Sequence, residues 1–522
     1  MAGAGAVGLA LALLLVAAFG DPARPQILPA AAQSDVRILL GELSTIDPAA
    51  QGDIGSAGFT AQLFESLTAF DSELVLRPAL AASWDVLDGG RRVVFHLRRG
   101  LTFSDGTPIH GDDVVRSWLR IIDPDAPSPL ASLMSGVRGA DDYLQDVNRD
   151  PLAVGLSADD NDVSVDLERP GADFPAIVAG PTFAIVPPGF DGGAPPDAEG
   201  FVGSGGYVLA AVTPTEYTLE ANSRYWAGAP AIRTAHLITD VGGRSAVAVF
   251  EDDLVDYTGI GAHDAAWIRY DETLGPHLRL VPSLSLSYLG FDAGEAPFDD
   301  VRVRRAFGAA VDWARVTGLG AANVSRQAQS MVPPDIPGAP GGSWLPAHDP
   351  DAARALLRAV GYPNGAGFPD IAFGTGYSPF AEAIAAELER ELAVTVNLEA
   401  FDDHYGRLAT DPPAMFTIGW VADYPAPNDF LGVLLRTGST NDYGRWSSGE
   451  FDAAIDAALA TADPASAEAA WRRVLEIVQS DVPVVPLVTG DGWALSRDGL
   501  LGAGQNGLGL LRVAGLAWVT NE

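Results

Sequence analysis

Residues 92–118, RVVFHLRRGLTFSDGTPIHGDDVVRSW, contain a strand signal, a turn signal and a helix signal in succession. Every second residue from Val93 to Leu97 is apolar, and this alternation predicts a half-buried strand. The SDGTP run at 104–108 has the composition of a turn. Two aspartates at 112–113 precede apolar residues at helical spacing, which predicts a helix that begins near them. This stretch therefore indicates a chain of mixed α/β class.

Strand and helix patterns continue in alternation on both sides of this stretch. Apolar runs with β-branched residues predict strands at 36–42, 207–212, 216–221, 284–291, 394–401 and 415–420, and a strand pair around the acidic turn at 159–162. Helical periodicity predicts helices at 59–70, 301–316, 349–360, 380–392, 449–462 and 464–480. Segment 187–205 is the richest in Pro and Gly, so we expect a boundary there.

The overall composition excludes several classes of protein. The chain has 522 residues and no cysteine, which removes disulfide scaffolds and thiol chemistry. Its length suggests several domains. The formal net charge of −36 results from 32 basic and 68 acidic residues. Such a negative field repels phosphate backbones, so we expect no nucleic-acid partner.

The amino-terminal segment has the character of an export signal. Residues 2–20 are apolar and uncharged, a run too short for a typical spanning helix and suited to a signal peptide. The small residues Ala30 to Ala32 could form a cleavage site, although no arginine precedes Arg24. We expect residues 1–33 to be either a signal peptide or an N-terminal membrane anchor, and the protein to be exported to the periplasmic or extracellular face.

The search for enzymatic motifs finds none. The Gly3/Gly5/Gly8 and Gly502/Gly504/Gly507 matches to the dinucleotide motif do not lie between a strand and a helix. The seven histidines are scattered, and the acidic turn at 159–162 lacks the glycine and glutamate of a calcium loop. We predict no catalytic residue, no cofactor and no metal.

Sequence blocks that occur in a particular order are more informative than any single motif. They are LSTIDP (43–48), LFESL (63–67), LRPALAASW (76–84), FHLRRG (95–100), LTFSDGTP (101–108), DDVVRSW (112–118), VGSGGY (202–207), ANSRYW (221–226), YLGFD (288–292), PFDD (297–300), VRRAF (303–307), DP–A–LL–GY (349–362) and GWVADYP (419–425). Block for block, the chain from about 34 to 497 resembles the bacterial family 5 extracellular solute-binding proteins, the oligopeptide- and dipeptide-binding components of ABC importers.

The resemblance implies an α/β two-lobe clamp with mixed sheets, hinged lobes and an extra third subdomain. A ligand would lie between lobes I and III, and the closed clamp would be presented to a membrane permease and its ATPase. We expect a monomer that takes peptides. The implied ranges are 34–67, 195–283 and 490–522 for lobe I, 68–194 for the lobe II extension, and 284–489 for lobe III.

The resemblance also implies the binding residues. In peptide-binding relatives the aspartate of the GWVADYP block pairs with the α-ammonium of the peptide, which makes Asp423 the first candidate; the alternative is that it braces a turn. Trp420 would form an aromatic wall or simply pack in the core. The remaining candidates are Gly205, Gly206 and Tyr207, where ligand backbone could approach closely, together with Tyr288 and Trp493.

Two departures from the family pattern leave the ligand open. Some dipeptide binders carry an arginine before the helix that corresponds to 380–392, and this chain has none at 374–379. Ala426-Pro427 replaces the usual Asp-Pro. The peptide carboxylate thus has no evident partner. The alternatives are another polar solute, such as an oligosaccharide or a metal chelate, and an extracytoplasmic hydrolase.

Overall fold

The computed structural model describes most of the chain after its amino-terminal segment. The described residues are 34–192, 198–320, 325–376, 378–401, 403–461, 463–504 and 507–519. The predicted signal or anchor segment, 1–33, and the predicted lobe boundary at 194/195 lie outside them. Within the described ranges, no helix is long and apolar enough to cross a membrane.

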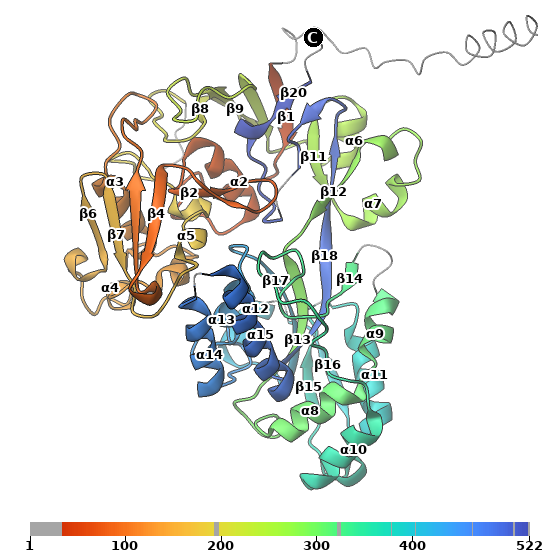
Figure 1. The fold of residues 1–522 in the computed structure, drawn as a ribbon. Coiled ribbons are helices and arrows are strands. Elements are labelled where there is room, and N and C mark those ends of the chain that lie inside the picture. The colour runs from red at the N-terminus through yellow and green to blue at the C-terminus, as the bar shows by residue number, and fades with distance from the viewer. Residues whose placement is uncertain are drawn as a thin grey trace, which may run out of the picture.

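One long mixed sheet organises most of the molecule (Figure 1). Its strands run in the order β16 (Val396–Glu399), β15 (Ile371–Gly374), β17 (Met415–Val421), β13 (Ser285–Phe291), β18 (Val484–Ser496), β11 (Tyr257–Ile260), β1 (Asp35–Leu39), β10 (Thr234–Ile238), β9 (Glu216–Ala221) and β8 (Tyr207–Val212), and β12 (Leu278–Pro282) and β14 (Ser325–Gln327) also pair with β18. We call the part built on β1 and β8–β12 lobe I, and the part built on β13–β17 lobe III.

Strand β18 belongs to both lobes. Its first half pairs with β13 and β14, and its second half pairs with β11 and β12. The β12–β13 connection is the second link, and it lies beside the middle of β18. We call residues 282–285 and 488–492 the hinge region. With so few links, the two lobes share little backbone (Figure 1).

The strand directions bring two sets of carboxyl ends face to face. Strand β11 is antiparallel to β18, so the carboxyl end of β11 lies at the hinge region. Strand β1 is parallel to β11 and ends on the same side. Strand β17 is antiparallel to β13 and ends with Val421 opposite Ser285, and β15 is parallel to β17. Ligands of open α/β sheets bind at the carboxyl ends of the strands. Both lobes therefore direct the carboxyl ends of these strands toward each other.

Lobe II is a separate four-stranded sheet (Figure 1). Its strands run in the order β4 (Ala81–Leu87), β5 (Arg92–Leu97), β7 (Asp162–Asp166) and β6 (Leu156–Asp159), and α3 (Gly111–Leu119) packs on it. The strand, turn and helix predicted over 92–118 are thus confirmed. The Trp118 ring is fully buried and meets the Phe95 ring edge-on at 6.1 Å.

The helices are distributed unevenly among the lobes. Lobe I holds α2 (Ile54–Leu63), α6 (Ala246–Glu251) and α7 (Ala262–Ile268); lobe II also holds α4 (Ala140–Leu144) and α5 (Phe174–Ile177); lobe III holds α8 (Val301–Ala310), α9 (Trp313–Gly320), α10 (Pro350–Ala359), α11 (Ala381–Leu392), α12 (His404–Thr410), α13 (Pro427–Leu435), α14 (Gly449–Leu459) and α15 (Pro464–Asp481). The helix predicted at 301–316 is two helices, α8 and α9.

The helix predicted at 59–70 is wrong at both ends. It begins at Ile54, where the Asp53 side chain accepts a hydrogen bond from the Ser56 amide. It ends at Leu63 because the next residues find partners elsewhere in the fold. The Glu65 amide donates to Ser204 Oγ at 2.9 Å, and the Glu65 carbonyl accepts from the Ile185 amide at 2.9 Å. These tertiary bonds replace the next helical turn.

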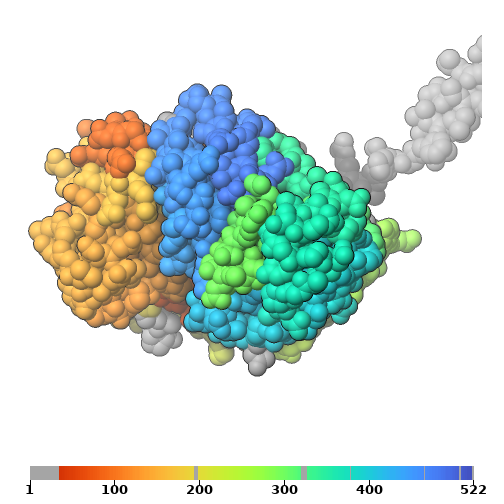
Figure 2. All heavy atoms as spheres, turned by 90° about the horizontal axis from the view of Figure 1, so that it is seen from below, coloured from red at the N-terminus to blue at the C-terminus, as the bar shows by residue number. Residues whose placement is uncertain are grey.

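Lobe II also packs directly against lobe III. Figure 2 shows the orange surface of lobe II beside the blue helices of lobe III. Phe70 and Leu74, next to the short hairpin of β2 (Thr68–Phe70) and β3 (Leu76–Pro78), belong to the same buried cluster as Leu434 of α13. The Ala172 amide donates to the Leu459 carbonyl at 3.1 Å. Lobe III therefore has a neighbour on two sides.

Candidate functional site

The acid predicted to be most important, Asp423, lies at the lobe III side of the space between the lobes. It follows β17 by two residues and is half-buried. The neighbouring Ala422 amide donates to the Leu284 carbonyl of the hinge region at 2.9 Å. Burial raises the pKa of Asp423 to about 6. Asp423 is therefore fixed at the carboxyl end of a strand, next to the hinge.

A second carboxylate, Asp429, lies beneath Asp423. It is fully buried in the first turn of α13. Its Oδ2 accepts from Trp420 Nε1 at 2.9 Å and from the Asp423 amide at 3.3 Å. Its Oδ1 is buried and has no hydrogen-bond partner among the described residues. Burial and the adjacent charge of Asp423 hold the pKa of Asp429 well above its usual range.

Asp429 differs from the other buried acids of this chain. Seven carboxylate side chains are buried in the part that the structure describes, and six of them pair with an arginine. The pairs are Asp47 with Arg120, Glu65 with Arg512, Asp113 with Arg116, Asp256 with Arg37, Asp292 with Arg445, and Glu387 with Arg315. Of these seven described acids, only Asp429 lacks such a cation. A buried charge without a partner is costly, so Asp429 is the exception among these acids.

A third acid approaches from lobe II. Asp173 Oδ2 accepts from the Tyr424 hydroxyl at 3.0 Å and from Asn428 Nδ2 at 3.1 Å. Burial raises the pKa of Asp173. These bonds fasten the turn between β17 and α13 to lobe II. No group of three His, Asp or Glu side chains in the described ranges is placed to hold a metal ion.

A cavity lies on the lobe I side. Its volume is about 290 Å³, and it lies at the carboxyl ends of β1 and β11, beside α2. The lining residues are Ile38, Leu39, Leu40, Gly41, Ile54, Gly55, Gly58, Gln62, Leu237, Tyr257, Thr258, Gly259, Gly509, Leu511 and Val513. Near Gly509, the Gly507 carbonyl accepts from the Leu284 amide at 2.9 Å, and Leu284 in turn bonds Ala422. Two backbone hydrogen bonds thus connect the cavity wall to the residue before Asp423.

Three of the predicted aromatic residues have different surroundings. Trp420 is half-buried and braces Asp429 through its indole N–H. Tyr288 is 2 % exposed inside lobe III, and burial raises its pKa. Trp493 lies on β18 of lobe I with the Arg269 guanidinium 5.3 Å from its ring, and its indole nitrogen is buried without a hydrogen-bond partner among the described residues. Trp420 alone contacts the pair of acids.

The predicted residues Gly205, Gly206 and Tyr207 lie in the core of lobe I. A Cβ on Gly205 would lie 2.5 Å from the Gln62 carbonyl oxygen, so the close approach at this glycine is to α2. A Cβ on Gly206 would meet that of Ala514 at 3.1 Å. Tyr207 is fully buried, and its hydroxyl donates to the Ile232 carbonyl at 2.9 Å. In this structure all three residues contact the protein itself.

Asp429 and Tyr257 were not found by sequence reasoning. Asp429 is one of 68 acidic residues and stands where acids commonly stabilise the start of a helix. The only available signal was its position directly before the apolar run FLGVLL. Tyr257 has no signal of its own, because a tyrosine in a strand is ordinary core.

The chain resembles known proteins over most of its length. The family model of the bacterial extracellular solute-binding proteins, family 5, matches residues 75–442. "Probable deoxycholate-binding periplasmic protein YgiS" of Escherichia coli (strain K12) is 28 % identical over 467 residues, 85 % of each chain. "Periplasmic oligopeptide-binding protein OppA" of Salmonella typhimurium is 27 % identical over 481 residues, 87 % of each chain.

Solved structures share the fold. The unliganded open form of the murein tripeptide binding protein MppA has a TM-score of 0.79 at 22 % identity, over 94 % of this chain and 98 % of that one. The predicted two-lobe α/β class is confirmed by this likeness and by the sheets described above. With the family model covering more than half of the sequence, the chain belongs to the bacterial extracellular solute-binding proteins of family 5.

Proposed function

We propose that this protein captures peptides between lobes I and III and delivers them to the permease of an ABC importer. The α-ammonium of the peptide would bind Asp423, with Asp429 directly beneath it. We assign residues 34–67, 195–283 and 490–522 to lobe I, 68–194 to lobe II and 284–489 to lobe III. The protein would act as a monomer, with the permease and its ATPase as partners.

The observation that carries this proposal is the missing arginine at Asp429. Six other buried acids have an arginine within the chain, and this one lies beside a second acid instead. An ammonium group placed on Asp423 would supply the missing positive charge. Hydrogen bonds between charged groups are strong once water is excluded, so the gain on binding is large at this position.

The alternative explanation of Asp429 is purely structural. An acid in the first turn of a helix is stabilised by the amide groups there, and Asp429 occupies such a position in α13. Its Oδ2 also braces the turn before α13, because it accepts from the Asp423 amide. The structural explanation does not account for the adjacent carboxylate of Asp423. It also leaves Oδ1 of Asp429 without a hydrogen-bond partner among the described residues.

The names of the relatives favour a peptide as the ligand, but they also show that members of the family are named for other ligands. OppA and MppA are named for oligopeptides and a murein tripeptide, whereas YgiS is named for deoxycholate. A ligand with a cationic group fits Asp423 and Asp429 better than an anionic or neutral one. A free ammonium is common to all unmodified peptides, and this favours the peptide.

Ligand screening tests the proposal. A ligand that binds only the folded protein stabilises it by RT ln(1 + [L]/Kd), about 2.7 kcal/mol at a hundredfold excess over Kd. A peptide library should therefore raise the melting temperature, and small-angle scattering should show a smaller radius of gyration with peptide. Native mass spectrometry of protein purified from cells should show a bound peptide. A response to sugars or metal chelates and to no peptide would contradict the assignment.

The proposed location has its own test. Family 5 members are extracellular by description, and we propose that residues 1–33 direct export as a signal peptide or remain as an anchor. Amino-terminal sequencing of a cleaved, exported form should begin between Pro22 and Val36. Intact protein free in the cytosol would contradict export.

A further inference from the structure

We propose that the lobe I cavity binds an apolar group of the ligand, of the size of a two-ring aromatic, and that the Tyr257 hydroxyl bonds a polar atom of that group. This inference rests on the proposed function in so far as it assigns both sites to one ligand. The ligand would be a peptide, or another cation, that carries a bulky aromatic side chain. The cavity itself can be tested without a cation.

Most of the side chains that line the cavity are apolar. They include Ile38, Leu237, Leu511 and Val513, and none of the lining residues is charged. Gln62 is the main polar side chain in the wall, and it is fully engaged: its Nε2 donates to the Gly58 and Leu511 carbonyls, and its Oε1 accepts from the Val513 amide. Such walls favour an apolar occupant.

Tyr257 provides one free polar group. Its side chain is 1 % exposed, and its hydroxyl has no hydrogen-bond partner among the described residues. It lies on the same face of the sheet as Ile38, which also lines the cavity. Buried hydroxyls are normally bonded, so an unbonded one beside a cavity indicates a ligand that completes it.

Glycines keep the cavity open at the carboxyl ends of β1 and β11. Gly259 follows Tyr257 by two residues and so faces the same side of the sheet. A Cβ on Gly259 would meet nothing within 4 Å, and a Cβ on Gly58 would meet only a methyl of Leu40 at 3.5 Å. Ile54 is 55 % exposed and lines the cavity. An apolar group can therefore enter from the space between the lobes.

The volume sets the size of the occupant. A cavity of about 150 Å³ holds benzene, so about 290 Å³ holds a group of roughly two rings or a branched alkyl chain. The wall that includes Gly509 continues through Gly507 and Leu284 to Ala422, next to Asp423. One ligand can therefore place its cation on lobe III and its apolar group in lobe I.

The test uses an uncharged fluorescent probe, N-phenyl-1-naphthylamine, titrated into the full chain. The probe should bind at one saturable site. Gly259→Leu fills the entrance and should weaken binding at least about tenfold. Gly261→Leu adds the same side chain at another exposed glycine, outside the cavity, with open space at its Cβ, and should change nothing. Tyr257→Phe should weaken binding about fivefold without lowering the melting temperature.

The outcomes separate this inference from the proposed function. Asp423→Asn should leave probe binding unchanged, because the probe carries no cation. Trp-Gly-Gly should displace the probe, and Gly-Gly-Gly should not. Equal binding to wild type and Gly259→Leu, or absence of saturable binding to wild type, would overturn the inference. If Gly259→Leu fails to fold, unchanged binding to Tyr257→Phe has the same consequence.

Discussion

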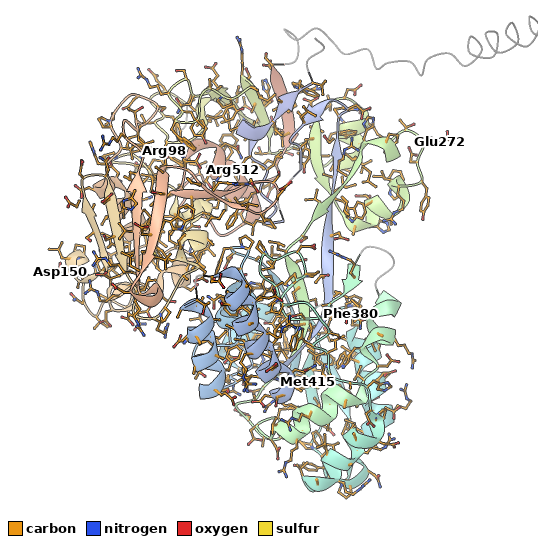
Figure 3. All side chains as sticks on the ribbon, viewed as in Figure 1. Arg98, Asp150, Glu272, Phe380, Met415 and Arg512 are labelled. Atoms are coloured by element: carbon orange, nitrogen blue, oxygen red, sulfur yellow. The ribbon has the colours of Figure 1, made fainter. Side chains whose placement is uncertain are left out.

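Two buried acids of the same molecule have opposite surroundings. Glu65 of lobe I is 2 % exposed, and its Oε1 lies 2.9 Å from Nη1 of Arg512 while its Oε2 accepts from the Tyr225 hydroxyl. Arg512 is labelled in Figure 3. Asp429 of lobe III is fully buried beside Asp423, without an arginine among the described residues. Glu65 has its cation in the chain. Asp429 does not.

Under the proposed function, the difference separates structural acids from binding acids. An internal ion pair such as Glu65–Arg512 holds parts of lobe I together, and it leaves no charge for a ligand. A pair of acids without a cation makes the ligand-free protein less stable and gives a cationic ligand more to gain. Burial alone therefore does not distinguish the two acids, whereas the presence or absence of a counter-charge does.

Removal of Arg512 should have the largest effect on stability. Arg512→Met leaves Glu65 buried without its cation and should lower the free energy of unfolding by about 3–5 kcal/mol. Urea unfolding measures this loss. The matched control is Arg315→Met, because Glu387 keeps Arg390 at 3.2 Å and the loss should stay below about 1 kcal/mol. Equal losses in the two variants would mean that the pair in lobe I has no special role.

Removal of the charge on Asp429 should have the opposite sign. Asp429→Asn keeps an acceptor for the Trp420 indole and removes a buried like charge, so the ligand-free protein should gain about 1–2 kcal/mol at pH 7. Because burial raises the pKa of both acids, this gain should shrink as the pH falls toward the ordinary aspartate pKa of about 4, since the unfolded chain then also takes up protons. Urea unfolding at pH 7 and pH 4 measures the difference. A loss of stability at pH 7 would favour the structural role of Asp429.

The pH dependence of binding should be smaller still. With the pKa of Asp423 near 6, most of this acid is ionised at pH 7 and protonated at pH 5. The affinity for a free-amine peptide should fall about tenfold between these values, since only the ionised form attracts the ammonium. Burial also raises the pKa values of its neighbours Asp429, Asp173 and Tyr424. Calorimetric titration at both pH values measures the change. An affinity that is constant from pH 5 to pH 7 would contradict the binding of the ammonium by ionised Asp423.

The sequence predicts local structure well where the pattern is local. The alternation at 92–97 becomes β5, and the strand predictions at 207–212 and 216–221 match β8 and β9. Strand β18 escaped prediction because Pro483 precedes it and Pro486 interrupts its apolar run, although it joins both lobes. A strand that changes partners halfway carries no periodic signal.

The candidate site is only partly visible in the sequence. Asp423 is found through the resemblance of its block to the family, but Asp429 and Tyr257 depend on contacts across the fold. The same limit applies to Gly205 and Tyr207, whose contacts across the fold cannot be read from the sequence. A glycine beside an aromatic residue indicates a close approach, but not whether the partner is a ligand or, as here, α2.

The most direct test is a calorimetric titration of one peptide, with a free and with an acetylated amino terminus, into wild type and Asp423→Asn. The free peptide should lose about 2–5 kcal/mol of binding free energy in the variant, roughly thirty- to several-thousand-fold in affinity. The acetylated peptide should bind both proteins with similar, weak affinity, and ligand-free melting should not fall. Equal losses for both peptides would mean that Asp423 does not recognise the ammonium.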